Sequence, residues 1–196
     1  MVEQAQHWLP RARRALFEIY RQQAASTWIE ADGQSMQPLI RPGDWMLVEF
    51  GALPTAVGEI ALFSRGDIVV AHRVVAHRRG AAPLITKGDA EPYCDPPLGA
   101  AHVLGVVRAL RHGPHSSPSD AGCRGPSARA IARVSRWSGR GAALARRMAT
   151  VLPDPVRRAA LSAIPPLARV VAQALLAPIC WAARIHAVRS DRAERR

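Results

Sequence analysis

Short apolar runs that end in glycine-containing turns fill the middle of the chain. The runs read STWIEADG (26–33), DWMLVEFG (44–51), GEIALFS (58–64), DIVVAHRVVA (67–76), APLITKGD (82–89) and HVLGVVRAL (102–110). Their length, their branched apolar residues and the Pro-Gly-Asp, Arg-Gly-Asp and Lys-Gly-Asp turns between them are typical of β-strands. Several short strands at this spacing predict a compact, mainly β domain over residues 26–112.

The pattern changes on both sides of this domain. Residues 1–25 predict a short amphipathic helix, with apolar side chains on one side and arginines on the other. Residues 113–127 are rich in Gly, Pro and Ser and predict a flexible linker. Residues 128–196 are rich in Ala, Arg and Leu, and the breaks LPDP and IPP divide them into two or three short, basic helices. We therefore expect truncation after Ser127 to leave a working domain.

Most of the net charge belongs to this C-terminal tail. Fourteen arginines and three acidic residues follow Ala128, which gives +11 of the formal net charge of +12. The first 127 residues are consequently close to neutral. Such an asymmetry suits an anionic partner, whether lipid headgroups, nucleic acid or an acidic protein.

Targeting segments and disulfide patterns are not evident. Arginines interrupt the N-terminal segment where a signal peptide needs an apolar core. The longest apolar stretch, residues 164–183, contains Arg169, Gln173 and three prolines, so we expect no clean transmembrane helix. The three cysteines, at positions 94, 123 and 180, match neither a disulfide framework nor a metal-binding spacing. The expected location is therefore peripheral on a membrane or cytoplasmic.

A serine in the box GQSMQP (33–38) is the first candidate for chemistry. Ser35 follows Gly33, which permits a sharp turn, and its backbone N–H could face a substrate carbonyl oxygen. A serine becomes a nucleophile when a base takes its proton and donors stabilise the oxyanion. A lone serine in a loop is more often structural, so this box alone is a modest signal.

A histidine and two carboxylates could complete such a site. His72 lies within DIVVAHRVVA, on the same strand face as Val70 and Val74. Apolar surroundings keep an imidazole neutral, as a general base requires, although a histidine on an apolar strand is more often a core residue. Asp89 and Asp95 follow in the next box, and either carboxylate could orient His72 as the third member of a serine–histidine–acid arrangement.

Taken together, these boxes resemble a known family. GQSMQPLIRPGD, GEIALF, AHRVV, TKGDAEPYCD and VLGVV are similar in order and spacing to the boxes of type I signal peptidases, members of the S24/S26 serine peptidase superfamily. The resemblance covers roughly residues 27–108 and does not extend to the tail. It implies a twisted, coiled domain of antiparallel β-sheets, as in signal peptidases and self-cleaving repressors.

The resemblance also implies roles for single residues. Bacterial signal peptidases and the self-cleaving repressors have a lysine base where this chain has His72, whereas the archaeal, endoplasmic-reticulum and sporulation-type branch has histidine there. The implied roles are Ser35 as nucleophile, His72 as base and Asp95 as the acid. The supporting positions are Gly33, Met36, Arg73, Lys87, Gly88 and Asp89.

Three departures from the family pattern stand out. Gly33 occupies the position at which many members have a serine hydroxyl as an oxyanion donor. Ala90 replaces the asparagine of the usual Gly-Asp-Asn. A short helix with arginines stands where the family has a membrane anchor. Gly33 leaves backbone donors for the oxyanion, whereas the missing anchor bears on the secretory role and leaves the peptidase chemistry intact.

We therefore expect a serine endopeptidase of the signal-peptidase type that cleaves precursor peptides or proteins after small residues, without metal or cofactor. The basic tail is expected either to hold it on an anionic membrane surface or to form a solvated helical bundle on the domain. A self-cleaving repressor-like regulator and a non-catalytic peptide-binding relative are the alternatives. Only about 25 residues precede the predicted β domain, too few for a DNA-binding helix-turn-helix domain, so nucleic acid is not an expected partner.

Overall fold

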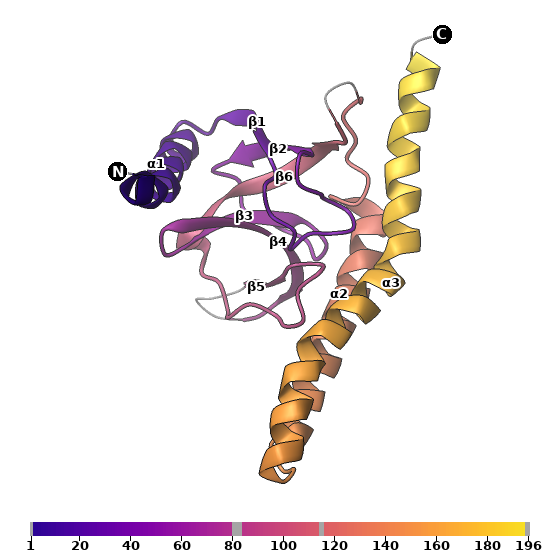
Figure 1. Ribbon diagram of the computed structural model, residues 1–196. Helices are drawn as coiled ribbons and strands as arrows, with labels where there is room; N and C mark the ends of the chain where they lie inside the picture. Colours follow the sequence, from indigo (N-terminus) through magenta and orange to yellow (C-terminus); the bar gives the residue numbers. More distant parts are fainter. Residues whose placement is uncertain (1, 80–83, 114–115, 195–196) are drawn as a thin grey trace.

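A computed structural model describes residues 2–79, 84–113 and 116–194 (Figure 1). A six-stranded antiparallel sheet forms the body, one helix precedes it, and two long helices follow it. This arrangement confirms the mainly β fold with an N-terminal helix and a helical C-terminal extension. The start of the predicted strand at 82–89, residues 114–115 of the predicted linker and both chain ends lie partly outside the described residues.

Each of the six apolar runs forms a strand. The strands are β1 (Ser26–Glu30), β2 (Trp45–Phe50), β3 (Ile60–Arg65), β4 (Ile68–His77), β5 (Leu84–Lys87) and β6 (Val103–Arg111). The helices are α1 (Val2–Gln22), α2 (Gly125–Ala149) and α3 (Asp154–Glu194), and a single 3-10 turn (Ala100–His102) leads into β6. The strand boundaries agree with the glycine-containing turns, because glycine and aspartate end extended runs.

The order of the strands in the sheet is β1-β2-β6-β3-β4-β5. The last strand, β6, therefore returns between β2 and β3 and separates strands that are neighbours in sequence. Register shifts occur in the β2–β6, β3–β6 and β4–β5 pairs. Such irregularities bend and twist a sheet, and the resulting curl places β1 and β4 on two sides of one cleft.

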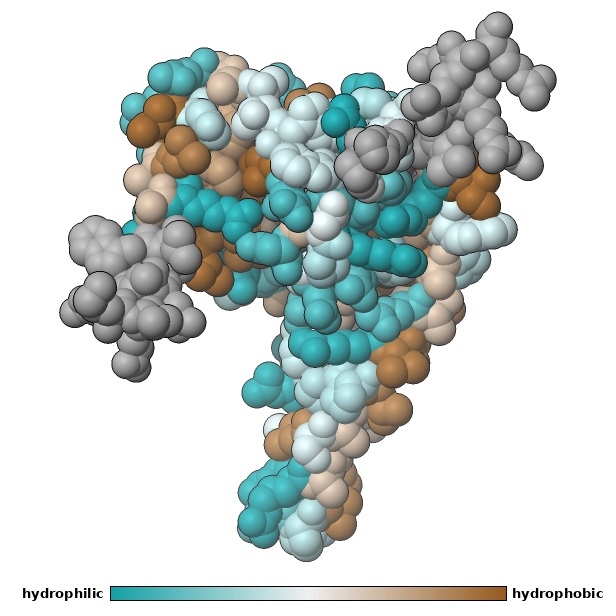
Figure 2. All heavy atoms as spheres, turned by 45° about the horizontal axis from the view of Figure 1, so that its top comes forward, coloured by the Kyte–Doolittle hydropathy of each residue, from teal (hydrophilic) through white to brown (hydrophobic). Residues whose placement is uncertain are grey.

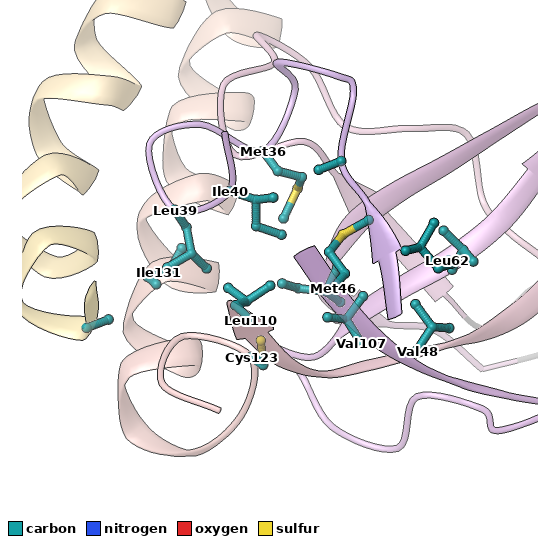
Figure 3. Packing of buried hydrophobic residues seen from close by; sticks show 14 of the residues in the cluster. Met36, Leu39, Ile40, Met46, Val48, Leu62, Val107, Leu110, Cys123 and Ile131 are labelled. Atoms are coloured by element: carbon teal, nitrogen blue, oxygen red, sulfur yellow. The ribbon is translucent and has the colours of Figure 1, made fainter. Parts of the chain in front are cut away.

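The segment between β1 and β2 is anchored in the main core. Met36, Leu39 and Ile40 are buried there, and Figure 3 shows them in the same interior as Leu110 of β6 and Ile131 of α2. Full burial of one such side chain contributes about 1.5–3 kcal/mol. The serine box is consequently fixed by apolar residues on its C-terminal side.

The C-terminal helices are longer than the sequence predicted. They form two helices of 25 and 41 residues instead of two or three short ones, and Pro165, Pro166 and Pro178 lie inside α3. By length and composition, the part of α3 from Asp154 to Ile185 could cross a membrane. Inside the protein, 17% of its most apolar window is buried, so most of that window is not covered by the domain. The expectation of an interrupted apolar stretch therefore needs correction, because the helix continues through its prolines.

A buried ion pair joins α2 to the sheet. Arg73 of β4 and Asp89 are both fully buried, and two guanidinium nitrogens donate to the carboxylate at 2.8–3.2 Å. The third nitrogen of Arg73 donates to the carbonyl oxygens of Gly58 and Gly122 at 2.7 Å each. Ser135 of α2 donates its hydroxyl hydrogen to the same carboxylate at 2.9 Å. This network places α2 inside the domain.

Helix α2 also packs closely against the sheet domain. A Cβ atom at Gly58 would lie 2.8 Å from the backbone of Ala128, so only glycine allows this approach. Ile131 and Ala132 of α2 are fully buried. These contacts argue against the expectation that truncation after Ser127 leaves a working domain, because the helix beyond that point contributes side chains to the core.

We expect truncation after Ser127 to abolish cooperative unfolding. The cut removes Ile131 from the core and leaves the buried Asp89 without the Ser135 hydroxyl. Together these losses should lower the free energy of unfolding by more than an ordinary single substitution does. Thermal unfolding followed by circular dichroism measures the effect. Ser135→Ala is the milder comparison and should lower the free energy of unfolding by about 1–3 kcal/mol. A truncated chain that melts at the temperature of the full chain would contradict this account.

Candidate functional site

Ser35 lies in the irregular segment between β1 and β2, and Asp44 holds the end of that segment. The Asp44 carboxylate accepts hydrogen bonds from the Arg41 N–H at 2.9 Å and from the Arg184 guanidinium at 2.9 Å, and it lies 3.1 Å from a ring nitrogen of His112. Burial alone would raise the pKa of Asp44, but these hydrogen bonds outweigh it and lower the pKa below its ordinary value. The Pro-Gly-Asp turn thus closes the segment with a charged carboxylate, and α3 contributes to it through Arg184.

The backbone of Ser35 is fixed on one side and free on the other. Its carbonyl oxygen accepts a hydrogen bond from the Ala90 N–H at 2.8 Å. Its own N–H donates to no other group among the described residues. The side chain is half-buried, and Met36 next to it is buried. A donor at the serine is therefore left for a ligand.

Gly33 does not have the role that the sequence suggested. A Cβ atom at this position would meet nothing within 4 Å, and its backbone lies outside the left-handed region. The turn consequently does not require glycine, and a larger residue such as serine would fit there.

His72 and Asp95 are in direct contact. His72 Nδ1 lies 2.7 Å from Asp95 Oδ2, and the His72 side chain is only 6% exposed. Thr86 of β5 donates its hydroxyl hydrogen to the same carboxylate oxygen at 2.7 Å, and Arg65 at the end of β3 forms an ion pair with the other oxygen. The Phe63 ring packs against the imidazole at 5.9 Å between centroids, nearly edge-on. These contacts fix the ring orientation.

The Asp95 carboxylate is held in its charged form. Burial would raise its pKa, but hydrogen bonding and attraction from His72, together with the hydrogen bonds from Thr86 and Arg65, outweigh burial. The pKa of Asp95 is therefore below its ordinary value. A charged carboxylate accepts hydrogen bonds only, which favours the imidazole tautomer that carries its proton on Nδ1 and leaves Nε2 as an acceptor.

Gly88 brings His72 and Ser35 to one small space. A Cβ atom at Gly88 would lie 2.9 Å from His72 Nε2 and 2.8 Å from the Ser35 carbonyl oxygen. Only a residue without a Cβ atom allows both groups to approach this closely. Among the described residues no hydrogen bond joins the Ser35 hydroxyl to the ring, but both residues line the same cavity with Asp95.

Two cavities of different character meet at Ser35. One, of about 230 Å³, is largely apolar and lies between β1, β4 and α1; its lining includes Phe17, Ile29, Met36 and Leu62. The other is more open, and its lining combines the ionisable side chains of Arg65, His72, Glu91 and Asp95 with apolar ones. An extended peptide that crosses Ser35 would therefore pass from mainly apolar surroundings to ones rich in ionisable groups.

The remaining predicted residues lie apart from the histidine. Asp89 is occupied by Arg73 and Ser135 in the buried network, so Asp95 is the carboxylate that touches His72. Lys87 is fully buried and donates to the Gly88 carbonyl at 3.1 Å. Burial lowers the pKa of Lys87. Its side chain packs closely against Gly139 of α2.

Sequence reasoning missed two of the groups around Asp95. Thr86 stands two residues before Gly88, and the alternation of β5 could have suggested that it shares a face with that glycine. Arg65 lies 30 residues from Asp95 and carries no local signal. No group of three or more His, Cys, Asp or Glu side chains suited to a metal ion occurs in the part of the chain that the structure describes.

Comparison with known proteins gives one family match. A family model described as Peptidase S24-like matches residues 3–107, which include α1, most of the sheet and the residues around Ser35, His72 and Asp95. No curated protein and no solved structure matches the chain. The match ends before α2 begins.

We expect the charged Asp95 to make the stability depend on pH in acid. Because its folded pKa is below the ordinary 3.8, its stabilising effect is fully present above that pH and is lost as the pH falls through the folded pKa. Asp95→Asn should lower the free energy of unfolding at neutral pH by about 1–3 kcal/mol. The difference from the parent should shrink as the pH falls below 3.8.

Urea unfolding at a series of pH values measures this difference. Asp32→Asn is a matched control, because its side chain is 78% exposed and should give little change at any pH. A deficit for Asp95→Asn that stays constant down to the acid limit would show that the charge of the carboxylate is not what matters.

Proposed function

Because the chain belongs to the Peptidase S24-like family, we propose that it is a serine endopeptidase in which Ser35 is the nucleophile, His72 the general base and Asp95 the residue that orients the base. Membership of this family fits peptidase or self-cleaving repressor-type activity. The observation that carries the finer assignment is the 2.7 Å contact between His72 Nδ1 and Asp95, with His72 Nε2 facing the space beside Ser35.

The proposed reaction begins with proton transfer from the serine. His72 Nε2 takes the proton of the Ser35 hydroxyl while its oxygen attacks the scissile carbonyl carbon. Asp95 stabilises the imidazolium that forms, and this stabilisation is larger because the pair is largely screened from water. His72 then protonates the leaving amine, and a water molecule hydrolyses the acyl-enzyme with His72 again as base.

Binding of the substrate is supported by the surroundings of Ser35. The free N–H of Ser35 is placed to donate to the oxyanion, and no serine hydroxyl at position 33 assists it. The apolar cavity bordered by Ile29, Met36 and Leu62 would take apolar side chains on the acyl side of the cut. The resemblance to signal peptidases narrows these to small residues such as alanine. Precursors of that kind are met at membranes, so we place the activity at a membrane surface.

Cleavage of other chains is favoured over self-cleavage. A self-cleaving regulator needs a segment of its own chain in extended form at the serine. The N-terminal segment at the apolar cavity is α1, which contributes Arg13 and Phe17 as part of a helix. Helical carbonyl groups are hydrogen-bonded and closed to attack, so self-cleavage there would require α1 to unwind.

The first test is removal of the nucleophile. Ser35→Ala should lower kcat/KM on a peptide with alanine on the acyl side by at least about a thousandfold, because the rest of the site cannot replace the nucleophile. Ser64→Ala on β3, outside both cavities, is the matched control and should keep the parent rate. Mass spectrometry of the products identifies the cut. Absence of cleavage by the parent protein, with tight binding of the same peptide, would support a non-catalytic relative instead.

The second test separates His72 from Lys87 as the base. His72→Gln should lose nearly all activity, whereas Lys87→Met should keep it within about tenfold, since methionine fills the buried space without the charge. The two variants test the base more directly than a pH profile does, because burial lowers the pKa of Lys87 below its ordinary value. Retained activity in His72→Gln with loss in Lys87→Met would move the protein to the serine–lysine type.

A further inference from the structure

The outward face of α3 is apolar and uncovered. Between Ala159 and Ala183 the helix carries a single charged residue, Arg169, which forms an ion pair with Glu91 of the domain. Five large apolar side chains of this helix are at least half exposed beyond its first turns: Leu167, Val170, Val171, Leu175 and Trp181. Apolar surface of this kind marks an interaction site more often than an ordinary solvated surface.

Helical spacing puts these residues on one side of α3. Leu167, Val171 and Leu175 follow each other at intervals of four, and Val170 and Trp181 fall beside the same line. The opposite side holds Ala172, Leu176 and Cys180, which are buried against the rest of the protein. A helix that is apolar all round belongs in a core or at a membrane. In α3 one apolar side is buried in the core of the protein, and the opposite apolar side is exposed.

The neighbouring helix adds positive charge next to apolar side chains. On α2, Arg133, Trp137, Arg140 and Leu144 alternate at intervals of three and four residues, and all four are exposed. Such intervals make them neighbours on the helix surface. Figure 2 shows hydrophobic residues along one edge of the projecting pair of helices and hydrophilic residues along the other.

We propose that the α2–α3 pair binds the surface of an anionic phospholipid membrane. The apolar face of α3 enters the boundary between headgroups and acyl chains, and the arginines of α2 contact the lipid phosphates. Trp137 and Trp181, which are 78% and 68% exposed, suit the interface between lipid and water. This inference stands on observations outside the proposed catalytic site and does not depend on peptidase activity.

Charge and polarity select lipid over the other candidate partners. A nucleic acid would match the arginines but offers nothing to the uncharged face of α3. A second copy of the chain would cover the apolar face, but it would bring two sets of arginines together and repel them. An anionic bilayer satisfies both features at once.

The helices lie on the membrane and do not cross it. Arg184 of α3 donates to the buried Asp44 carboxylate at 2.9 Å and to the Leu39 carbonyl oxygen at 2.8 Å. Leu176 lies in the domain core with no exposed surface. A spanning helix would have to break these contacts and expose the core, whereas surface binding keeps the whole structure.

Flotation of the full chain with phosphatidylcholine vesicles, with and without phosphatidylglycerol, tests the proposal. We expect binding at least tenfold tighter to the anionic vesicles, weakened when the salt is raised from about 0.1 M to about 1 M. Leu167→Gln/Val171→Gln and Arg133→Gln/Arg140→Gln should each weaken binding by about tenfold or more. Each variant changes exposed residues only, so the fold and the proposed cleavage activity should be retained.

Matched variants elsewhere on the surface serve as controls. Leu53→Gln/Ile68→Gln and Arg78→Gln/Arg79→Gln remove the same kinds of exposed side chain from the domain and should bind like the parent. Equal binding to neutral and anionic vesicles, or equal losses in test and control variants, would overturn the proposal. So would release by detergent alone, which indicates a spanning helix. A dimer that Leu167→Gln/Val171→Gln dissociates, without vesicle binding, would assign the face to a second copy.

Discussion

The ion pair between Arg73 and Asp89 is the interaction on which the arrangement of this protein depends. Neither side chain has any exposed surface, so each charge relies on the other and on the groups around the pair. Loss of one partner from such a pair typically costs about 3–5 kcal/mol, because the remaining charge stays buried. The carbonyl oxygens of Gly58 and Gly122 and the hydroxyl of Ser135 complete the hydrogen bonds, and they come from three separate parts of the chain.

The same pair determines where the candidate catalytic groups lie. Arg73 follows His72 on β4, so strand alternation directs one side chain to the buried network and the other to the cavity at Ser35. Asp89 follows Gly88, the residue whose missing Cβ lets His72 Nε2 and the Ser35 carbonyl approach. A shift in the network would therefore move both sides of the site. In this way α2, which touches Asp89 through Ser135, supports a site from which it is absent.

The sequence predicts the strands well because they are local features. Each run is short, branched and bounded by a glycine-containing turn, so its extent depends on neighbouring residues alone. The position of β6 between β2 and β3 depends on contacts distant in sequence, and no local pattern encodes it. The length of α3 was missed for a related reason. Each internal proline costs about 3 kcal/mol in an isolated helix, but packing against α2 and the core offsets this cost.

The candidate site also combines residues that local sequence patterns identify with residues that only contacts distant in sequence bring in. The sequence boxes identify Ser35 and His72 as candidates, and only the family resemblance favours Asp95 over Asp89. Geometry supplies the physical reason: Asp89 is saturated by a guanidinium, while Asp95 meets the imidazole. Thr86 and Arg65 were not identified, because their part in the site consists of contacts with Asp95 that only the folded sheet creates.

The net charge of the tail does not distinguish arginines that are paired inside the protein from arginines that are exposed. The excess of arginine suggested a basic tail, but the arginines fall into groups with different physical roles. Within the tail, Arg184 pairs with the buried Asp44 carboxylate and stabilises the fold, as Arg73 of β4 does with Asp89. Arg133 and Arg140 are exposed beside apolar side chains, so their charges are left for an external anion. A net charge counts paired and unpaired arginines alike, whereas an external anion meets the unpaired ones. The separation of paired from unpaired arginines is the physical basis of the membrane-binding face that we propose for the helical pair.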